Sequence, residues 1–344
     1  METVINPPRQ QWVSLVRRNI TDAATVAEAV DAIIERVSAE GDAALRDYAL
    51  KFDGSHIDAL EVSQEEIAAA GDAVSPDVKR AIATGIANIE TFHAAQLPHE
   101  VKVETMPGVT CVQRAVPLQR VGLYIPGGQA PLFSTVMMLA VPARIAGCPE
   151  VILCTPQSHD RPIAPEILYT ARECGVSRIY RVGGAQAIAA MAVGTDSIAR
   201  VDKIFGPGNR FVTRAKQVLS QRVAIDMPAG PSEVLVMADD SCNPMFVAAD
   251  MLSQAEHGPD SQAICVCSST ETAAVVRDAV ELLKKRLSRT DSIEKSLSHS
   301  RIIVLPSTDD MISFVNGYGP EHLIISMHSP WEVACLLYTS DAAD

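Results

Sequence analysis

The sequence predicts an α/β protein with two Rossmann-like domains, each built on a parallel β-sheet, and an N-terminal helical segment. From about residue 109, short apolar runs alternate with stretches of helical length. Such alternation produces right-handed βαβ units whose sheets are covered by helices on both faces. It occurs in two series, which the Pro- and Gly-rich segment 226–232 separates. We therefore expect two sheets and a chain crossover at that segment.

Helices are expected over most of the first hundred residues. Apolar residues spaced three and four apart predict one helix that ends at Gly41, and they are Val26, Val30, Ile33, Ile34 and Val37. Ser63 and Glu66 form a predicted capping box, and Ser75 followed by Pro76 begins another helix. The buried stripe of that helix consists of Val78, Ile82, Ile86 and Ile89.

Each strand of the first series is followed by a helix. These strands are expected at 120–126, 151–155, 178–182 and 203–205, and the helices at 134–147, 165–174, 184–193 and 208–219. In the second series, strands are expected at 232–238, 262–267, 301–305 and 323–326, and helices at 243–257, 270–288 and 308–316. The predicted domains are an N-terminal arm (1–20), a discontinuous first α/β domain (21–123 plus 231–334), a second α/β domain (124–230) and a tail (335–344).

Composition excludes several functional classes. The chain of 344 residues carries 29 basic and 42 acidic residues, and its formal net charge of −13 opposes binding to a nucleic-acid backbone. Its start lacks the regions of a secretory signal, and no apolar run reaches about 18 residues, so we expect a cytoplasmic protein without a membrane span. The eight cysteines form no CxxC pair and are expected to be reduced and mostly buried.

Five short loops rich in Gly and Pro adjoin the predicted strands. Glycine lets a ligand approach the backbone, and exposed helix N–H groups suit phosphate or carboxylate. In α/β folds, ligands bind at the carboxyl ends of the strands. The first three loops close strands and the last two enter them, which predicts a shared cleft. The loops span 126–129, 183–186, 206–209, 229–232 and 318–322.

The helix at 243–257 carries a candidate metal-binding pair. Gln254 and His257 lie one helical turn apart, so an amide and an imidazole point the same way and can share one metal ion. Gln is an uncommon zinc ligand, and the same spacing fits a solvent-facing polar stripe. Spacing alone leaves both interpretations open. The buried face of this helix consists of Val247, Ala248, Met251, Leu252 and Ala255.

Glu321 and His322 form a second candidate pair, in a tight loop before the apolar run 323–326. A carboxylate and an imidazole that titrates near neutral pH suit stepwise proton abstraction from an alcohol. A Glu–His turn pair without a role remains the alternative. GxGxxG, GxxxxGKS/T, HExxH and GxSxG motifs are absent from the sequence. Residue patterns alone therefore indicate a two-domain α/β enzyme, with metal assistance as one option.

Six segments together resemble the histidinol dehydrogenase family in order and approximate spacing, from about residue 10 to about residue 330. They are Arg120–Gly128, Val182–Ile188, Lys203–Asn209, Ile225–Glu233, Leu252–Gln262 and Gly319–Leu323. The resemblance implies oxidation of L-histidinol through L-histidinaldehyde to L-histidine with two NAD⁺, at the end of histidine biosynthesis.

The resemblance also assigns roles to eight residues. It implies that Gln254 and His257 bind one zinc ion per subunit, which positions the substrate. His322 would be the base that takes the alcohol proton, and Glu321 would activate the water that hydrates the aldehyde. The substrate would contact Ser232, Gln254, His257 and His322, and the NAD site would be lined by Tyr124, Gln186 and Asn209.

The C-terminal end departs from the family. The resemblance fades near residues 331–334, and residues 335–344 do not resemble the family, whose chain continues further. That continuation supplies an Asp and a His to the zinc and part of the interface of a domain-swapped homodimer. We expect a truncated copy that binds zinc poorly and turns over little histidinol, because Gln254 and His257 are fewer than the three or four protein ligands of stable zinc sites.

Three alternatives to an active enzyme of this family remain. One is a truncated, catalytically inactive remnant of the same fold. Another is an aldehyde dehydrogenase-like enzyme, which needs an activated cysteine, whereas none of the five loops contains one. The third is a zinc hydrolase, for which the sequence offers no compact ligand triad.

Overall fold

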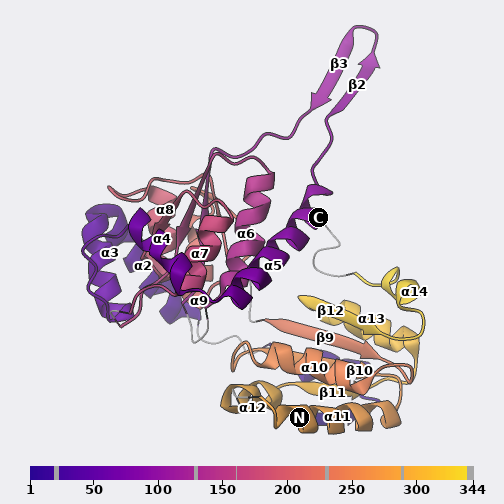
Figure 1. The fold of residues 1–344 in the computed structure, drawn as a ribbon. Helices are drawn as coiled ribbons and strands as arrows, with labels where there is room; N and C mark the ends of the chain where they lie inside the picture. Colours follow the sequence, from indigo (N-terminus) through magenta and orange to yellow (C-terminus); the bar gives the residue numbers. More distant parts are fainter. Residues whose placement is uncertain (19–22, 128–130, 160, 229–231, 288–289, 339–344) are drawn as a thin grey trace. The chain divides into compact units, whose positions relative to one another are not determined.

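The structure, a computed structural model, describes residues 1–18, 23–127, 131–159, 161–228, 232–287 and 290–338 (Figure 1). The chain divides into two compact units: unit 1 comprises Met1–Thr21 and Gly230–Asp344, and unit 2 comprises Asp22–Ala229. Each unit contains a five-stranded sheet whose neighbouring strands are all parallel. The predicted α/β class with two parallel sheets is confirmed.

The sheet of unit 2 has the strand order β6-β5-β4-β7-β8. Its strands are β4 (Arg120–Tyr124), β5 (Glu150–Cys154), β6 (Arg178–Tyr180), β7 (Lys203–Phe205) and β8 (Ala224–Ile225). The helices between them are α6 (Phe133–Ile145), α7 (Pro165–Glu173), α8 (Gly184–Val193) and α9 (Arg210–Leu219). The first predicted series is therefore confirmed, and β8 is an addition to it.

Two N-terminal helices of unit 2 begin at the predicted capping residues, and Gly41 follows the end of a third. The N-terminal helices of this unit are α2 (Ala23–Glu40), α3 (Asp42–Tyr48), the π-helix η2 (Ala49–Asp53), α4 (Gln64–Ala73) and α5 (Pro76–Ala94). The Ser63 hydroxyl accepts the Glu66 N–H, and the Glu66 carboxylate accepts the Ser63 N–H, which completes the predicted capping box of α4. The Ser75 hydroxyl caps α5, whose first residue is Pro76.

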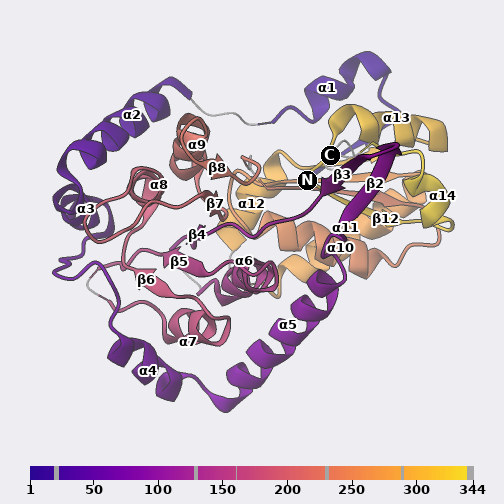
Figure 2. The ribbon, with the colours of Figure 1, turned by 90° about the horizontal axis from the view of Figure 1, so that it is seen from above.

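These N-terminal helices pack outside the helices that flank the unit 2 sheet, on both sides of it (Figure 2). α2 packs against α8 and α9, α4 against α7, and α5 against α6. One core joins residues of 26–60 to residues of 124–223, and the other joins residues of 62–82 to residues of 121–179. This corrects the predicted grouping of 21–123 with 231–334. An apolar stripe predicts that a helix is buried, but it does not identify the sheet that buries it.

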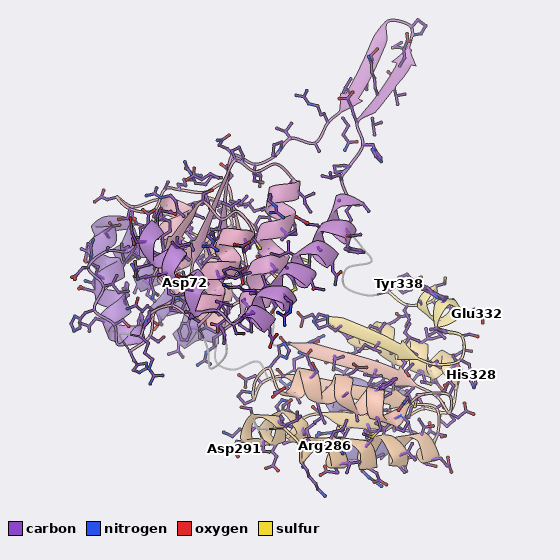
Figure 3. The ribbon with its side chains drawn as sticks, viewed as in Figure 1. Asp72, Arg286, Asp291, His328, Glu332 and Tyr338 are labelled. Atoms are coloured by element: carbon purple, nitrogen blue, oxygen red, sulfur yellow. The ribbon has the colours of Figure 1, made fainter. Side chains whose placement is uncertain are left out.

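Residues 101–113 form a hairpin that the sequence analysis does not predict. Strands β2 (Val101–Met106) and β3 (Val109–Gln113) are antiparallel and pair with each other. Every residue of both strands is exposed, and their side chains project into solvent on both faces (Figure 3). Apolar and polar residues occur on each face, so the usual alternation of a half-buried strand is missing.

The sheet of unit 1 has the strand order β1-β11-β10-β9-β12. Its strands are β1 (Glu2–Ile5), β9 (Glu233–Ala238), β10 (Gln262–Cys267), β11 (Arg301–Val304) and β12 (His322–Ser326). One face is covered by α10 (Pro244–Ala255), α11 (Thr270–Lys284) and α12 (Thr290–Ser298). The other face is covered by α1 (Trp12–Leu15), α13 (Thr308–Tyr318) and α14 (Pro330–Ala334).

The N-terminal arm is part of unit 1. β1 pairs with β11, and the short 3-10 helix η1 (Arg9–Gln11) leads into α1. The Trp12 ring lies 5.3 Å from the Phe314 ring, edge to face, and Val16 is buried in the same core. The arm predicted at 1–20 therefore supplies an edge strand and core residues. A four-residue strand and a four-residue helix are too short to give a periodic pattern.

No helix among the described residues is long and apolar enough to cross a lipid bilayer.

The two buried faces of the unit 2 sheet lead to a stability prediction. Leu123 of β4 is 0% exposed, whereas Val112 of the hairpin is 56% exposed. Leu123→Ala should lower the free energy of unfolding of unit 2 by about 2–5 kcal/mol, because it leaves a cavity in a packed core. Val112→Ala should change it by less than about 0.5 kcal/mol. Chemical denaturation of both variants measures this, and equal losses would contradict the packing described.

Candidate functional site

The carboxyl edge of the unit 2 sheet gathers the three residues expected to line a NAD site. The chain passes from β4 outward through β5 and β6, then returns to place β7 on the other side of β4. Ligands bind at such a switch point in open α/β sheets. Tyr124 ends β4, Gln186 lies in the first turn of α8, and Asn209 is the N-cap of α9.

Tyr124, Gln186 and Asn209 line one cavity of about 1390 Å³. Its wall also includes Asp53 at the end of η2 and His159. The buried Tyr124 hydroxyl accepts the Gly184 N–H at 3.0 Å, and burial raises the pKa of Tyr124 to about 12. The volume suits a large ligand. The structure thus brings these three residues together in one pocket.

A close backbone contact fixes the loop between β7 and α9. Gly206 has φ of +133°, and a Cβ at this position would lie 2.1 Å from the Tyr124 carbonyl oxygen. Only glycine fits there. The Gly206 N–H donates to Asp226, and the buried Lys216 ammonium donates to the Gly206 carbonyl at 3.0 Å and pairs with Asp226. These contacts hold the loop that leads to Asn209 beside the end of β4.

The other candidate residues lie at the amino edge of the unit 1 sheet. Ser232 precedes β9, and Glu321 and His322 stand at the start of β12, which pairs with β9. Because α10 returns from the far end of β9, its C-terminal end, with Gln254 and His257, lies at this same edge. The Ser232 carbonyl accepts the Gln262 N–H at 3.1 Å, which joins β9 to β10 there.

Glu321 and His322 point into the same space. Glu321 Oε1 and His322 Nε2 are 3.9 Å apart, and both side chains are exposed to solvent. Glu321 Oε2 accepts the backbone N–H of Glu233 at 3.1 Å. The turn before β12 therefore brings the two neighbouring side chains together, although successive residues within a strand point to opposite faces.

Gln254 and His257 present atoms that fit a metal ion. The Gln254 side chain is buried, and its Nε2, which only donates, has no hydrogen-bond partner among the described residues, so Oε1 would be the atom that binds a metal. His257 Nδ1 lies 2.9 Å from the Ser253 carbonyl oxygen. A carbonyl only accepts, so Nδ1 carries the proton and Nε2 keeps its lone pair for a metal. The sequence predicts that the helix extends to residue 257. In the structure α10 ends at Ala255, so His257 lies in the turn after the helix.

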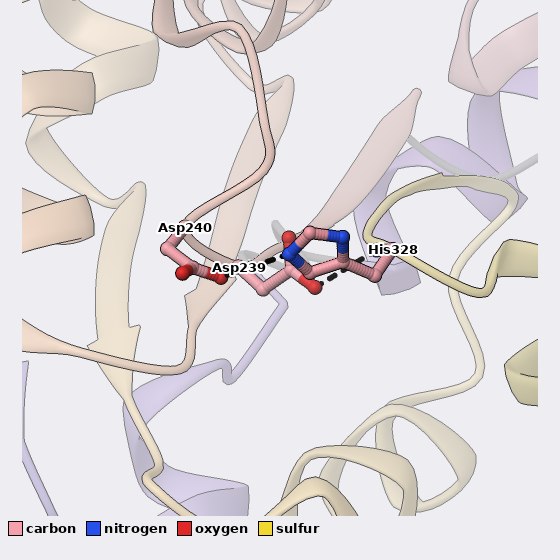
Figure 4. A group of neighbouring side chains, drawn as sticks. All are labelled: Asp239, Asp240 and His328. Carbon is pink, nitrogen blue, oxygen red and sulfur yellow. Dashed lines mark hydrogen bonds and ion pairs between the residues drawn. The ribbon is translucent and has the colours of Figure 1, made fainter.

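The carboxyl edge of unit 1 holds a group that the sequence analysis missed. Asp239 and Asp240 follow β9 and His328 follows β12, and their ligand-type atoms lie within 4.8 Å of one another (Figures 3 and 4). Asp239 is already satisfied, because its oxygens accept from the Ser241 N–H and hydroxyl and from the His328 N–H. Burial alone would raise the pKa of Asp239, but these hydrogen bonds outweigh that effect, so the pKa of Asp239 is lowered. These hydrogen bonds hold the loops that follow β9 and β12.

The thiols of Cys154, Cys174, Cys242 and Cys265 are not activated. Burial raises the pKa of the Cys154, Cys174 and Cys242 thiols. A hydrogen bond with Cys267, and burial after it, raise the pKa of the Cys265 thiol. A nucleophilic cysteine needs a lowered pKa. These pKa directions argue against a covalent thioester mechanism at these cysteines.

The five Gly- and Pro-rich loops separate into two sets. Those after β4, β6 and β7 contribute to the cavity of unit 2, and those before β9 and β12 meet at the amino edge of unit 1. Residues 128–129 and 229–231 of these loops lie outside the described residues. A cleft shared by all five loops stays a prediction.

Known proteins are similar to this chain over nearly its whole length. The sequence model of a family described as Histidinol dehydrogenase matches residues 16–340. The match includes residues 335–340, which corrects the expectation that the tail as a whole does not resemble the family. The histidinol dehydrogenase of Salmonella choleraesuis (strain SC-B67) is 54% identical over 321 residues, which are 92% of this chain and 73% of that protein. For Escherichia coli O157:H7, identity is 53% over 328 residues, with 94% and 75% covered.

Solved structures agree with the sequence comparison. The crystal structure of histidinol dehydrogenase from Elizabethkingia anophelis is similar with a TM-score of 0.95 and 46% identity, covering 98% of this chain and 78% of that one. An NAD-dependent aldehyde dehydrogenase from Sinorhizobium meliloti, with a TM-score of 0.50 and 13% identity over 96% of this chain and 77% of that one, shares the fold alone. The chain belongs to the histidinol dehydrogenase family.

Proposed function

We propose that this protein oxidises L-histidinol through L-histidinaldehyde to L-histidine, in two NAD⁺-dependent steps, in the cytoplasm. Family membership makes it an oxidoreductase of histidine biosynthesis. The observation that carries the detailed proposal is the Glu321–His322 pair, whose carboxylate and imidazole lie 3.9 Å apart at the same sheet edge as Gln254 and His257. The homodimer that the resemblance implies stays a prediction.

Gln254 and His257 would hold the zinc ion. Gln254 would bind it through the Oε1 of its buried amide, and His257 through its free Nε2. Zinc, when bound, would supply a positive charge that fixes the imidazole and amino groups of the substrate. The C-terminal end of α10 favours a cation, because the helix dipole is negative there. Two ligands are fewer than a stable site uses, so further ligands must complete the coordination.

His322 and Glu321 divide the proton transfers. In the first step, His322 Nε2 takes the hydroxyl proton of histidinol while the carbon-bound hydrogen leaves as hydride. In the second step, Glu321 takes a proton from the water that adds to the aldehyde, and the carbonyl oxygen gains a proton, which gives a diol. The diol then loses a hydride and a proton to become the carboxylic acid. Both groups are solvent-exposed, so each proton can pass to bulk water. Gln254 and His257 hold the other end of the substrate, which places its hydroxymethyl group for reaction.

The cavity of unit 2 would hold NAD⁺, which accepts the hydride in both steps. Tyr124, Gln186 and Asn209 line it, and the N-terminal ends of α8 and α9 adjoin it. Exposed N–H groups at helix N-termini suit a pyrophosphate. Asp53 lies on the same wall, where burial raises its pKa to about 6 although the His159 imidazole acts in the opposite direction.

Replacing a proposed ligand should weaken zinc binding. His257→Ala should raise the zinc dissociation constant more than about tenfold, since even partners of a ligand typically contribute 10–100-fold. His328→Ala is the matched control, because it removes a histidine from the opposite edge of the same sheet. Isothermal titration with Zn²⁺ measures both variants. A larger loss in His328→Ala would place the metal at Asp239 and Asp240 instead.

The two catalytic residues should separate the two oxidations. Glu321→Gln should still oxidise histidinol but slow the oxidation of histidinaldehyde by about 10²–10⁴-fold. His322→Asn should slow histidinol oxidation by a similar factor and still oxidise added aldehyde. NADH formation with each substrate measures the division. Equal losses for both substrates in both variants would argue against separate roles, and no NADH from the unaltered protein would favour the inactive remnant.

The raised pKa of Asp53 predicts a pH-dependent stability. Because its pKa is about 6 in the folded protein and about 3.9 when unfolded, its contribution is fully present below about pH 4 and is lost as the pH rises through 6. Asp53→Asn stays neutral and should gain stability relative to the unaltered protein over this range. Denaturation of unit 2 between pH 4 and 8 measures the difference. Asp72→Asn removes an exposed carboxylate of the same unit and controls for net charge. A pH profile of Asp53→Asn that runs parallel to that of the unaltered protein would contradict the prediction.

A further inference from the structure

An ion pair whose carboxylate is buried adjoins the Glu321–His322 pair. The Glu233 side chain is 6% exposed, and both of its carboxylate oxygens accept hydrogen bonds from Arg18. Arg18 Nε donates to Oε1, and Nη2 donates to Oε2 at 2.9 Å. The planar guanidinium matches a carboxylate in this two-bond geometry. A carboxylate buried this deeply needs such a partner.

Arg18 also contacts the turn that leads to Glu321. Its Nη2 donates to the carbonyl oxygens of Tyr318 and Gly319, both at 3.1 Å. Tyr318 is the last residue of α13, and Gly319 is its C-cap with φ of +58°. The last carbonyls of a helix have no partner within it, and a cation there is favourable. The guanidinium therefore fixes the end of α13 from which the turn begins.

The same turn is held from two further sides. The Tyr318 hydroxyl donates to Gln262 Oε1 at 2.7 Å, and Gln262 Nε2 donates to the His299 carbonyl at 3.0 Å. Glu233 completes the network, since its side chain binds Arg18 and its backbone N–H donates to the Glu321 carboxylate. One residue thus joins the ion pair to the proposed acid–base pair.

We infer that Arg18 and Glu233 are positioning residues that hold Glu321 and His322 in the orientation that catalysis needs. This inference rests on the proposed function for its effect on turnover. Arg18 acts through the 318–321 turn and through Glu233. It is not needed to attach the N-terminal arm, because β1 pairs with β11, Arg9 pairs with Asp310, and Trp12 packs on Phe314.

Arg18→Met tests the role, with Arg9→Met as the matched control. Both variants remove an arginine of the arm that pairs with an acid elsewhere in unit 1, but among the described residues the Arg9 side chain donates to Asp310 and not to the 318–321 turn. The full chain is assayed with added Zn²⁺, NAD⁺ and histidinol. Arg18→Met should lower kcat about 100-fold, as a displacement of about 1 Å can, while KM for histidinol changes little. Arg18→Lys should recover part of kcat, and Arg9→Met should keep it.

Amide hydrogen exchange gives a readout that does not depend on turnover. In Arg18→Met, exchange of the Glu233 N–H and of the amides of residues 318, 319, 321 and 322 should quicken at least about tenfold, because the turn opens more often. Arg9→Met should leave it unchanged. Unchanged exchange and kcat in Arg18→Met, or equal losses in Arg9→Met, overturn the inference. If Arg18→Met fails to fold, Arg18→Lys decides by the same measurements. Absence of NADH formation in the unaltered protein counts against the proposed function, while exchange still decides the positioning role.

Discussion

The pairing of β12 with β9 is the constraint on which the candidate active site depends. Its register sets His322 opposite Val234, which places Glu321 beside Glu233 and within reach of that residue's N–H. A shift of one residue would turn every side chain of β12 to the other face. The site thus needs a correct strand register. The Glu321 carboxylate, a proposed catalytic group, itself accepts a hydrogen bond from the neighbouring strand β9.

The two sheets present their candidate residues at opposite edges. In unit 2, Tyr124 is the last residue of β4 and Asn209 follows β7, as the rule for open α/β sheets predicts. In unit 1, Ser232 and His322 stand where β9 and β12 begin. A helix that follows a strand runs back to the strand's start, so α10 delivers Gln254 to that amino edge. No general rule places ligand sites at the amino edge of a parallel sheet. The candidate site of unit 1 is therefore identified by the chemistry of its side chains alone.

Sequence patterns predicted what depends on neighbouring residues and missed what depends on distant ones. The capping box of Ser63 and Glu66 and the apolar stripes of α2 and α10 are local, and the structure confirms them. The site residues came from motif resemblance, because spacing alone left the pairing of Gln254 with His257 open. The partner of α2, the addition of β1 to the unit 1 sheet and the link from Arg18 to Glu233 join segments far apart in the chain. No local pattern encodes such partners.

Hydrogen-bond satisfaction distinguishes the two groups of ligand-type atoms in unit 1. Asp239 accepts three hydrogen bonds from its own loops, so a cation there would compete with bonds that already exist. Gln254 is buried with its Nε2 unpaired among the described residues, and an unpaired buried polar group costs about 1–3 kcal/mol. A fold keeps such a cost where a ligand removes it. Because Nε2 donates, a hydrogen-bond acceptor of a bound ligand is expected beside Gln254, whereas a metal would be held by Gln254 Oε1 and by the free nitrogen of His257 at the negative end of α10.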